Sequence, residues 1–290
     1  MMNDFLLSIL LGIVEGLTEF LPVSSTGHLR IVEALFNLNL HDSFWKMYTI
    51  VIQLGAILAL PVYFWNRILK FLSTFPKGER GDRNFLNHPL SLTMIAFVVT
   101  ALPAWALTKV IGKNLESLRV ITISLIVGGI IMWIVDAVFT RPRVNHMEEM
   151  SFPQAIWIGA CQILSAVFPG TSRSMSTIAA GQIAGLSRPA ALEFSFFLSM
   201  PTMAVATLYD LYKTLKPSRD TMGEGNIAPL AVDAHGWIVL AIGFVISFIV
   251  ALAVVAWFMN WVRARGFVPF AIYRIVLGIA LVILLTRGLI

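Results

Sequence analysis

The sequence predicts an all-α integral membrane protein, with six transmembrane helices and two re-entrant helical hairpins arranged as inverted repeats. Composition gives the first indication, because 58% of the 290 residues are hydrophobic and only 13% are charged. Several apolar runs approach or exceed the ~20 residues that a helix needs to cross a bilayer, and they lack the alternation of barrel strands. Two other apolar segments are interrupted by breaks rich in hydroxyl groups, which is typical of hairpins that enter a membrane and return.

The first interrupted segment, residues 4–37, is the first predicted hairpin, and its polar stretch at 15–28 reads E-G-L-T-E-F-L-P-V-S-S-T-G-H. Glu15 and Glu19 are four residues apart, so they share one helix face. Pro22 ends that helix. A second helix follows, and the hydroxyl residues that can cap it are Ser24, Ser25 and Thr26. Ionisable groups at membrane depth are costly, so this stretch indicates a functional site.

The remaining elements follow the same order twice. After the first hairpin we expect crossings at residues 44–65, 90–110 and 118–139, joined by polar loops at 66–87 and 140–151. Asp136, near the end of the third crossing, is expected to face lipid headgroups. The second hairpin, residues 152–187, is broken at 169–174 by P-G-T-S-R-S. The last three crossings are expected at 189–212, 237–262 and 267–285.

This order predicts one membrane domain built from two repeats, residues 1–139 and 152–290, offset by about 147 residues. The offset pairs Gly12 with Gly159, Glu15 with Gln162, Pro22 with Pro169, Ser24 with Thr171 and Ser25 with Ser172. Three crossings per repeat are an odd number, so the second repeat starts from the opposite side of the membrane. The two breaks then meet near the midplane, where the dipoles of two half-helix N-termini favour an anion.

Charge limits the partners and suggests an orientation. A net charge of +5 is small for a nucleic-acid binder and fits membrane lipids better. The loops on the side of the termini hold eight Lys and Arg residues: Lys46, Lys109, Lys113, Arg119, Lys213, Lys216, Arg219 and Arg287. The opposite side holds ten: Arg67, Lys70, Lys77, Arg80, Arg83, Arg141, Arg143, Arg188, Arg263 and Arg265. The excess of two favours both termini outside the cell.

The single cysteine, Cys161, excludes an internal disulfide and argues against a thiolate metal cluster. The two breaks supply other chemistry. Arg173 offers a planar guanidinium that fits phosphate oxygens, although it could also pair with Glu15 or Glu19. The full candidate set is Glu15, Glu19, Ser24, Ser25, Thr26, His28, Thr171, Ser172, Arg173, Ser174 and Thr177. Hydroxyls and an arginine can bind phosphate, while the carboxylates and histidine can move protons or hold a divalent cation.

These residues carry a resemblance to a known family. The stretch at 15–28, the stretch P-G-T-S-R-S-M-S-T at 169–177 and the late F-V-P-F-A-I-Y-R at 267–274 are similar to the motifs of the bacterial undecaprenyl-diphosphate phosphatase family, also known for bacitracin resistance. The resemblance covers essentially the whole chain. It implies hydrolysis of undecaprenyl diphosphate to the monophosphate and inorganic phosphate, which recycles the lipid carrier for cell-wall synthesis.

The resemblance also implies an inner-membrane enzyme whose site faces the periplasm and uses a divalent cation, Mg²⁺ or Ca²⁺. Ser25 is then the expected nucleophile, and His28 the proton-transfer group or itself the nucleophile. Glu19 is expected to activate that pair and, with Glu15, to hold the cation. Arg173 would stabilise transition-state charge, with phosphate bound by Ser24, Thr26, Thr171, Ser172, Ser174 and Thr177. Three polar residues in the crossings are expected either to support the site or only to join helices: Gln53, Glu193 and Arg274.

Two other classes of protein remain open at this stage. A flippase or transporter of prenyl phosphates or phospholipids could also use inverted repeats and broken helices. The grouping of Ser25, His28 and Glu19 argues for the enzyme, because transport needs no nucleophile. A structural scaffold is disfavoured, since it has no need for polar groups at both breaks. A homodimer is compatible with the sequence.

Overall fold

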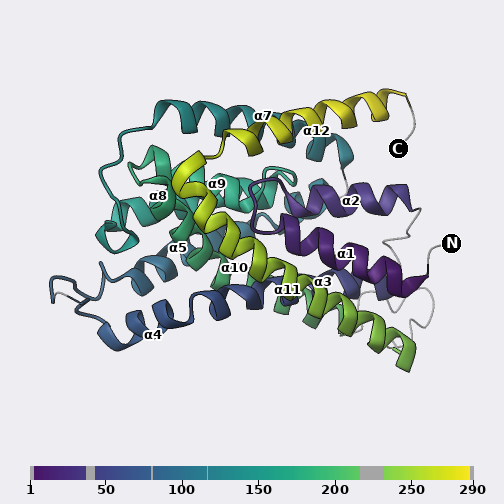
Figure 1. The fold of residues 1–290 in the computed structure, drawn as a ribbon, viewed down its shortest axis with the longest axis horizontal. Helices are drawn as coiled ribbons and strands as arrows, with labels where there is room; N and C mark the ends of the chain where they lie inside the picture. Colours follow the sequence, from purple (N-terminus) through teal and green to yellow (C-terminus); the bar gives the residue numbers. More distant parts are fainter. Residues whose placement is uncertain (1–2, 37–42, 80, 116, 216–231, 288–290) are drawn as a thin grey trace.

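The computed structural model describes residues 3–36, 43–79, 81–115, 117–215 and 232–287, and within these ranges it contains helices and no β-strand (Figure 1). Six of the described helices are long and apolar enough to cross a membrane: α3 (Ser43–Tyr63), α5 (Pro89–Ala106), α7 (Leu118–Val138), α10 (Arg188–Leu215), α11 (Ala234–Arg265) and α12 (Val268–Thr286). The predicted all-α membrane class and the six crossings are therefore confirmed. Of the Lys and Arg residues counted for the orientation, Arg80, Lys216 and Arg219 lie outside the described residues.

Two pairs of shorter helices reverse direction inside the bundle. The pairs are α1 (Asp4–Thr18) with α2 (Ser25–Leu35), and α8 (Phe152–Val167) with α9 (Arg173–Ile183). The longest of these helices, α8, has 16 residues, which gives a length of about 24 Å, shorter than the roughly 30 Å hydrocarbon core. In Figure 1 the α1–α2 pair lies toward the end of the molecule with both termini, and the α8–α9 pair lies toward the other end.

The first helix of each hairpin packs on a crossing from the other half of the chain. A Cβ atom at Gly12 of α1 would lie 2.9 Å from the carbonyl oxygen of Gly243 in α11. A Cβ atom at Gly159 of α8 would lie 2.4 Å from the carbonyl oxygen of Ala96 in α5. Glycine is therefore required at both positions, because any larger residue would push the helices apart. The division into two repeats stays a prediction, but these matched contacts agree with it.

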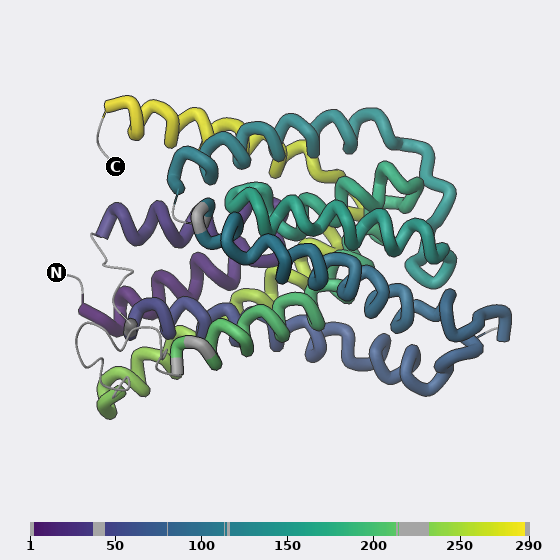
Figure 2. Tube along the Cα trace, turned by 180° about the vertical axis from the view of Figure 1, so that it is seen from behind, coloured from purple at the N-terminus to yellow at the C-terminus, as the bar shows by residue number. Residues whose placement is uncertain are grey.

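The crossings α7 and α12 run side by side along one flank of the molecule, as Figures 1 and 2 both show. A cluster of buried aromatic rings fills the interior between the first break and the crossings. Phe196 of α10 lies 5.6 Å from Phe20 at the first break and 6.4 Å from Phe258 of α11, measured between ring centroids. This contact between a break and the core fixes the position of the polar residues around Phe20.

The structure corrects two predictions about the crossings and loops. Residues 66–87 are not simply a loop, because α4 (Trp65–Thr74) begins there and extends the line of α3. This helix buries Phe71 and exposes Trp65 and Leu69, a pattern typical of helices at a membrane interface. The crossing predicted at 90–110 also ends earlier than expected. The helix α5 stops at Ala106, and the short helix α6 (Thr108–Leu115) follows it after a turn.

Asp136 was predicted to face headgroups, and this prediction is wrong. Its side chain is 1% exposed and accepts hydrogen bonds from Gln182 Nε2 at 3.0 Å, Arg188 Nε at 2.6 Å and the Phe267 backbone N–H at 2.9 Å. A carboxylate is stable inside the protein when it is paired and hydrogen-bonded in this way. Asp136 thus holds the ends of α7 and α9 and the starts of α10 and α12 together.

Candidate active site

The two breaks have the same local backbone geometry. Ser24 and Ser172 are the N-caps of α2 and α9, and their φ angles are 73° and 71°. Each side chain accepts a hydrogen bond from a backbone N–H of the first helical turn. The Ser24 hydroxyl accepts from Gly27 at 3.3 Å, and the Ser172 hydroxyl accepts from Met175 at 3.4 Å. The left-handed region is costly for a non-glycine residue, and such strain is found at functional sites. Ser24 therefore corresponds to Ser172 and not to Thr171 as the sequence offset predicted.

Glu19 joins the two hairpins. Its carboxylate accepts a hydrogen bond from the Ser25 hydroxyl at 2.5 Å and one from Arg173 Nη2 at 3.1 Å. The Glu19 side chain is 7% exposed and that of Arg173 is 12% exposed, so this ion pair lies largely inside the protein. The other guanidinium nitrogen, Arg173 Nη1, is buried and has no partner among the described residues. The structure thus brings a hydroxyl, a carboxylate and a guanidinium from both breaks to one point.

Glu15 lies one helical turn before Glu19 and is 1% exposed, with its carboxyl group within hydrogen-bonding reach of Glu19. The backbone N–H of Glu19 donates to the Glu15 carbonyl at 2.9 Å, which keeps the predicted spacing although α1 ends at Thr18, before Pro22. Two adjacent carboxyl groups are oxygen donors of the kind that Mg²⁺ and Ca²⁺ prefer. Among the described residues, no group of three or more Asp, Glu, His or Cys side chains surrounds a common point. Phosphate oxygens of a substrate would have to complete such a site.

His28 is bonded differently from the simplest expectation for a serine hydrolase. Its Nδ1 lies 2.7 Å from the Ser24 carbonyl oxygen, and its Nε2 lies 2.6 Å from the Tyr273 hydroxyl. The hydroxyl of Ser25 donates to Glu19 and not to His28. Glu19 is therefore the base within reach of the Ser25 proton, whereas His28 is bonded to Ser24 and Tyr273.

The hydroxyls of the second break have two different roles: some bond to the first break, and others bond within α9 or to the neighbouring helix α10. Ser174 is fully buried, donates to the Leu21 carbonyl at 3.0 Å and lies 3.0 Å from the Ser172 hydroxyl. These bonds tie the two breaks together. Thr177 lies 2.6 Å from Ser195 of α10 and donates to the Arg173 carbonyl, so its hydroxyl is used within the bundle. Thr26 is exposed and Thr171 is half-buried.

Arg274 of α12 is a further part of this centre, which the sequence suggested only as a supporting residue. Its side chain is fully buried, and it donates to the carbonyls of Pro22 at 3.1 Å, Gly170 at 2.9 Å and Ser124 at 3.1 Å. One guanidinium thus binds both breaks and α7. The signal that could have placed it was a permanent charge in the middle of a crossing, which is rare without a function.

The other two polar residues of the crossings stand apart from the breaks. Gln53 accepts a hydrogen bond from Thr207 at 3.2 Å, which joins α3 to α10. Glu193 pairs with Arg67 at 2.8 Å at the end of the molecule opposite the termini. Both side chains join helices, which is the structural alternative that the sequence left open.

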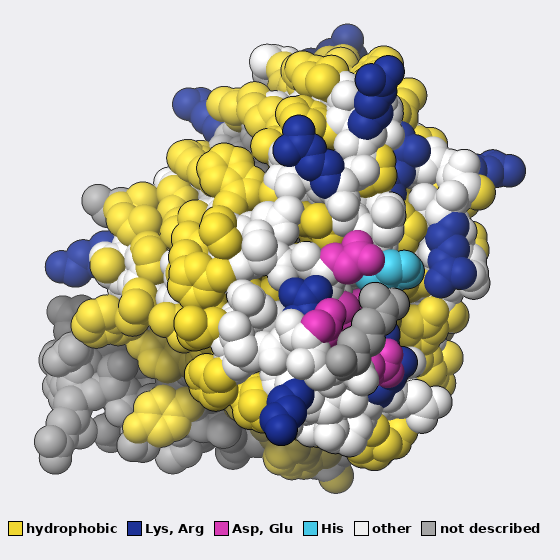
Figure 3. All heavy atoms as spheres, turned by 90° about the vertical axis from the view of Figure 1, so that its left-hand side faces the viewer, with side chains coloured by type: hydrophobic (Ala, Val, Ile, Leu, Met, Phe, Trp, Pro, Cys, Tyr) yellow, Lys and Arg dark blue, Asp and Glu magenta, His cyan; other side chains and the backbone are white. Residues whose placement is uncertain are grey.

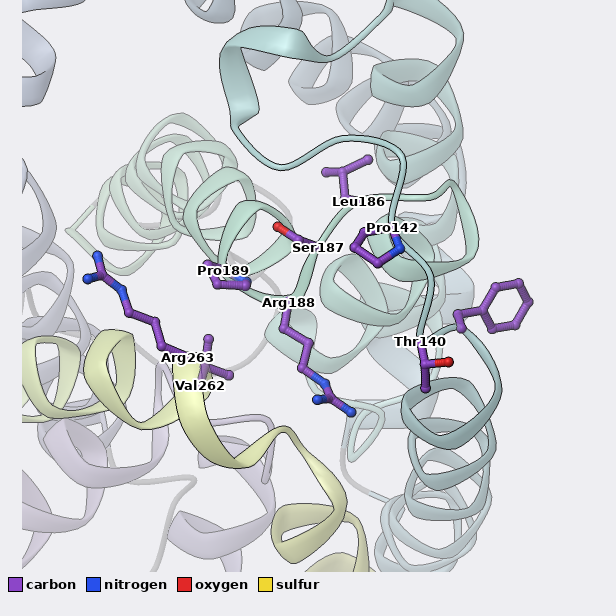
Figure 4. A pocket seen from close by; sticks show the side chains of 9 residues that line it. Thr140, Pro142, Leu186, Ser187, Arg188, Pro189, Val262 and Arg263 are labelled. Atoms are coloured by element: carbon purple, nitrogen blue, oxygen red, sulfur yellow. The ribbon is translucent and has the colours of Figure 1, made fainter.

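A separate cavity of about 200 Å³ opens at that end (Figure 4). Arg188 lines it but is held by Asp136, and the guanidinium of Arg263 points away from the other lining side chains in Figure 4. The remaining lining residues are Phe139, Thr140, Pro142, Leu186, Ser187, Pro189 and Val262. The cavity lacks the carboxylate, hydroxyl and guanidinium grouping of the breaks, so the breaks are the better candidate site.

Comparison with known proteins places the chain in one family. Residues 8–280 match the family described as bacitracin resistance protein BacA, which includes both breaks and the Tyr273–Arg274 pair. The chain is 64% identical to the undecaprenyl-diphosphatase of Koribacter versatilis over 280 residues, covering 96% of this chain and 97% of the relative. It is 42% identical to the enzyme of that name from a Bradyrhizobium species, covering 99% and 100%. A relative of the same name from Caldanaerobacter subterraneus is 40% identical, covering 97% and 96%.

Proposed function

The chain belongs to the bacitracin resistance protein BacA family, and from this membership we propose that it hydrolyses undecaprenyl diphosphate to undecaprenyl phosphate and inorganic phosphate. The observation that carries the proposal is the carboxylate of Glu19, which joins Ser25 of one hairpin to Arg173 of the other. The reaction recycles the lipid carrier for cell-wall synthesis. It also accounts for resistance to bacitracin in this family.

Ser25 is the nucleophile in this proposal. Its hydroxyl oxygen attacks the terminal phosphorus while its proton passes to Glu19, 2.5 Å away. The bond between that phosphorus and the bridging oxygen breaks, and undecaprenyl phosphate leaves with the electron pair. Water then attacks the phosphoserine, and the bond between the phosphorus and the Ser25 oxygen breaks as Glu19 returns the proton to that oxygen, giving inorganic phosphate and free Ser25. His28, near the same turn, takes the proton of that water.

Arg173 and the two helix N-termini stabilise the negative charge in this proposal. Arg173 Nη1 is buried without a partner, so a phosphate oxygen can bind it without displacing Glu19 from Nη2. The helices α2 and α9 begin directly after Ser24 and Ser172, and the positive ends of their dipoles would add to this stabilisation. Phosphoryl transfer depends largely on positioning and charge stabilisation of this kind.

A divalent cation, Mg²⁺ or Ca²⁺, is part of the proposal, held by Glu15 and Glu19 together with oxygens of the diphosphate. The two adjacent buried carboxyl groups fit this role. The cation would neutralise negative charge on the diphosphate. We expect activity to fall at least about tenfold after a chelator is added and to return with Mg²⁺ or Ca²⁺. Full activity in excess chelator would contradict the cation proposal and leave the role of Ser25 intact.

We also propose that the protein lies in the bacterial inner membrane with both termini and the opening of the site toward the periplasm. Ser25 and His28 begin α2, which runs back toward the end of the molecule that carries the termini. The opposite end, shown in Figure 3, bears many Lys and Arg side chains. By sequence, the loops on this side hold ten Lys and Arg residues, and those on the side of the termini hold eight. An excess of positive charge in loops is typical of the cytoplasmic side of a membrane protein.

The test is phosphate release from undecaprenyl diphosphate by the purified protein in detergent. The wild type is compared with Ser25→Ala, His28→Ala and Arg173→Ala, and with Ser73→Ala as a control for serine loss at an exposed position on α4. We expect release by the wild type and Ser73→Ala and a loss of at least about 100-fold in the other three. Activity retained in Ser25→Ala alone would move the nucleophile to His28 or water. No release from folded wild-type protein would overturn the proposal and favour a flippase.

A further inference from the structure

The crossing α12 places the side chain of Tyr273 in contact with His28. The Tyr273 hydroxyl lies 2.6 Å from His28 Nε2, and the two rings are stacked, with centroids 5.6 Å apart and an interplanar angle of 8°. Tyr273 precedes Arg274, whose guanidinium binds both breaks. Two consecutive residues of α12 therefore contact the site from outside the hairpins.

The hydrogen bonds define the state of the imidazole. A backbone carbonyl only accepts, so the bond to Ser24 places the hydrogen of neutral His28 on Nδ1. Nε2 then carries the lone pair and accepts from the Tyr273 hydroxyl. When Nε2 gains a proton it donates to the same tyrosine oxygen, because a phenol can do both. The contact thus persists on both sides of a proton transfer.

The packing of α2 gives this contact its importance. Only two of the 11 residues of α2 are buried, Gly27 and Glu33, whereas nine of the 11 residues of α9 are buried. The helix that carries His28 therefore has little surrounding packing to hold its side chains. Tyr273 supplies a hydrogen bond and a stacked ring from a different, membrane-crossing helix.

We propose that Tyr273 is a positioning residue for the reaction, which keeps His28 in the tautomer with hydrogen on Nδ1 and a lone pair on Nε2, and which holds Nε2 in place while it gains and loses a proton. This inference rests on the proposed function and adds a residue to it. Tyr273 acts through His28, so its removal affects the proton-transfer step more than substrate binding.

The first experiment compares Tyr273→Phe with the wild type in the phosphate-release assay. Tyr63→Phe is the matched control, since Tyr63 is a partly exposed tyrosine at the end of α3, away from the breaks. We expect kcat to fall about tenfold in Tyr273→Phe, a part of the ~10²–10⁴-fold effect of a proton-transfer group, with KM changed less than about twofold. An unchanged kcat, or a rise in KM alone, would overturn the inference.

The second experiment does not depend on activity. Protein labelled with ¹⁵N in its histidines is studied by NMR in detergent, and the His28 signals are identified by their loss in His28→Ala. We expect one tautomer with protonated Nδ1 in the wild type and in Tyr63→Phe, and a mixture of tautomers in Tyr273→Phe. The same single tautomer in Tyr273→Phe would overturn the inference. If the wild type releases no phosphate, the proposed function fails, and the NMR result still decides whether Tyr273 positions His28.

Discussion

At the scale of single residues, Glu19 shows how one side chain can serve two elements. Its carboxylate accepts one hydrogen bond from Ser25 of its own hairpin, at 2.5 Å, and one from Arg173 of the other hairpin, at 3.1 Å. A neutral amide at this position could not take the Ser25 proton and would leave the Arg173 charge without its partner. Loss of one partner from a buried ion pair is strongly unfavourable.

Glu19→Gln is therefore expected to lower kcat at least about 100-fold and to reduce thermal stability as well. The measurements are phosphate release and the melting temperature in detergent. Glu79→Gln is the control, because Glu79 pairs with Lys70 at an exposed position far from the breaks. Near-wild-type kcat in Glu19→Gln would mean that another group takes the Ser25 proton.

The sequence predicted which residue types gather at the breaks, and it offered the pairing of Arg173 with Glu15 or Glu19 as an alternative to phosphate binding, but it did not predict the partner of His28. Glu19, Ser25 and Arg173 could be grouped because polar residues in apolar helices are rarely accidental. The contact of His28 with Tyr273 depends on how α12 packs, and these residues are 245 positions apart. Asp136 was misplaced for the same reason, since its three partners come from distant segments.

At the scale of elements, close helix contacts set narrow limits on side-chain size. A methyl group at Gly159 would lie 2.4 Å from the Ala96 carbonyl oxygen, and the Thr100 hydroxyl donates to the Gly159 carbonyl at 2.7 Å across the same contact. The three atoms nearest to that methyl group all belong to the backbone of Ala96. The contact cannot adjust by rotating a side chain.

Gly159→Ala is expected to destabilise the protein by about 1–3 kcal/mol, because α8 must move away from α5. Thermal unfolding in detergent measures the effect. Gly112→Ala is the matched control, since a Cβ atom at Gly112 in α6 meets nothing within 4 Å. A Gly159→Ala protein as stable as Gly112→Ala would show that α8 and α5 are less closely packed than the structure indicates.

The start of α5 carries a pH-sensitive cap. His88 is fully buried, and its Nδ1 accepts the Leu90 N–H at 3.3 Å. Burial lowers the pKa of His88 below its ordinary value of 6.5, and the nearby charge of Arg83 lowers it further. The unfolded chain therefore takes up this proton before the folded protein does. The stability that neutral His88 supplies is complete above pH 6.5 and is lost as the pH falls through the lower folded pKa.

We expect the melting temperature to fall between pH 7.5 and pH 5.5, and to fall less in His88→Asn, whose side chain can cap the helix without titrating. His146→Asn, at an exposed position, serves as the control and should keep the wild-type slope. An equal slope in His88→Asn would assign the pH dependence to other groups.

Element ends were harder to predict than element types. Pro22 was expected to end the first helix, yet α1 ends at Thr18, because the chain already turns to place Glu19 and Phe20 at the break. The helix α4 was missed, since its composition is mixed and only its periodicity distinguishes it from a loop. Local composition does not fix where a tertiary contact ends a helix.

At the scale of the whole molecule, the order of elements was the strongest prediction. Six crossings and two hairpins follow from the lengths of apolar runs and the two proline-containing breaks, which are local properties. The pairing of Ser24 with Ser172 was missed by one residue. Only the backbone shows that these two serines share the same strained conformation.

Orientation is tested with single introduced cysteines and a membrane-impermeant maleimide on intact cells, in a Cys161→Ser background. Lys77, in the loop before the crossing α5, and Lys109, in the helix α6 after it, are both exposed. We expect Lys109→Cys to be labelled from outside and Lys77→Cys only after the inner membrane is permeabilised. The reverse pattern would place the opening of the site in the cytoplasm.

The position of Arg274 has a consequence for how the protein is made. Its guanidinium binds the carbonyls of Pro22 and Gly170 at the two breaks, yet it lies in α12, which leaves the ribosome after both hairpins. Both hairpins are inserted before that clamp exists. A nascent chain therefore carries all the proposed phosphate-binding residues while the contacts of Arg274 with the two breaks are still missing, and synthesis of α12 adds them.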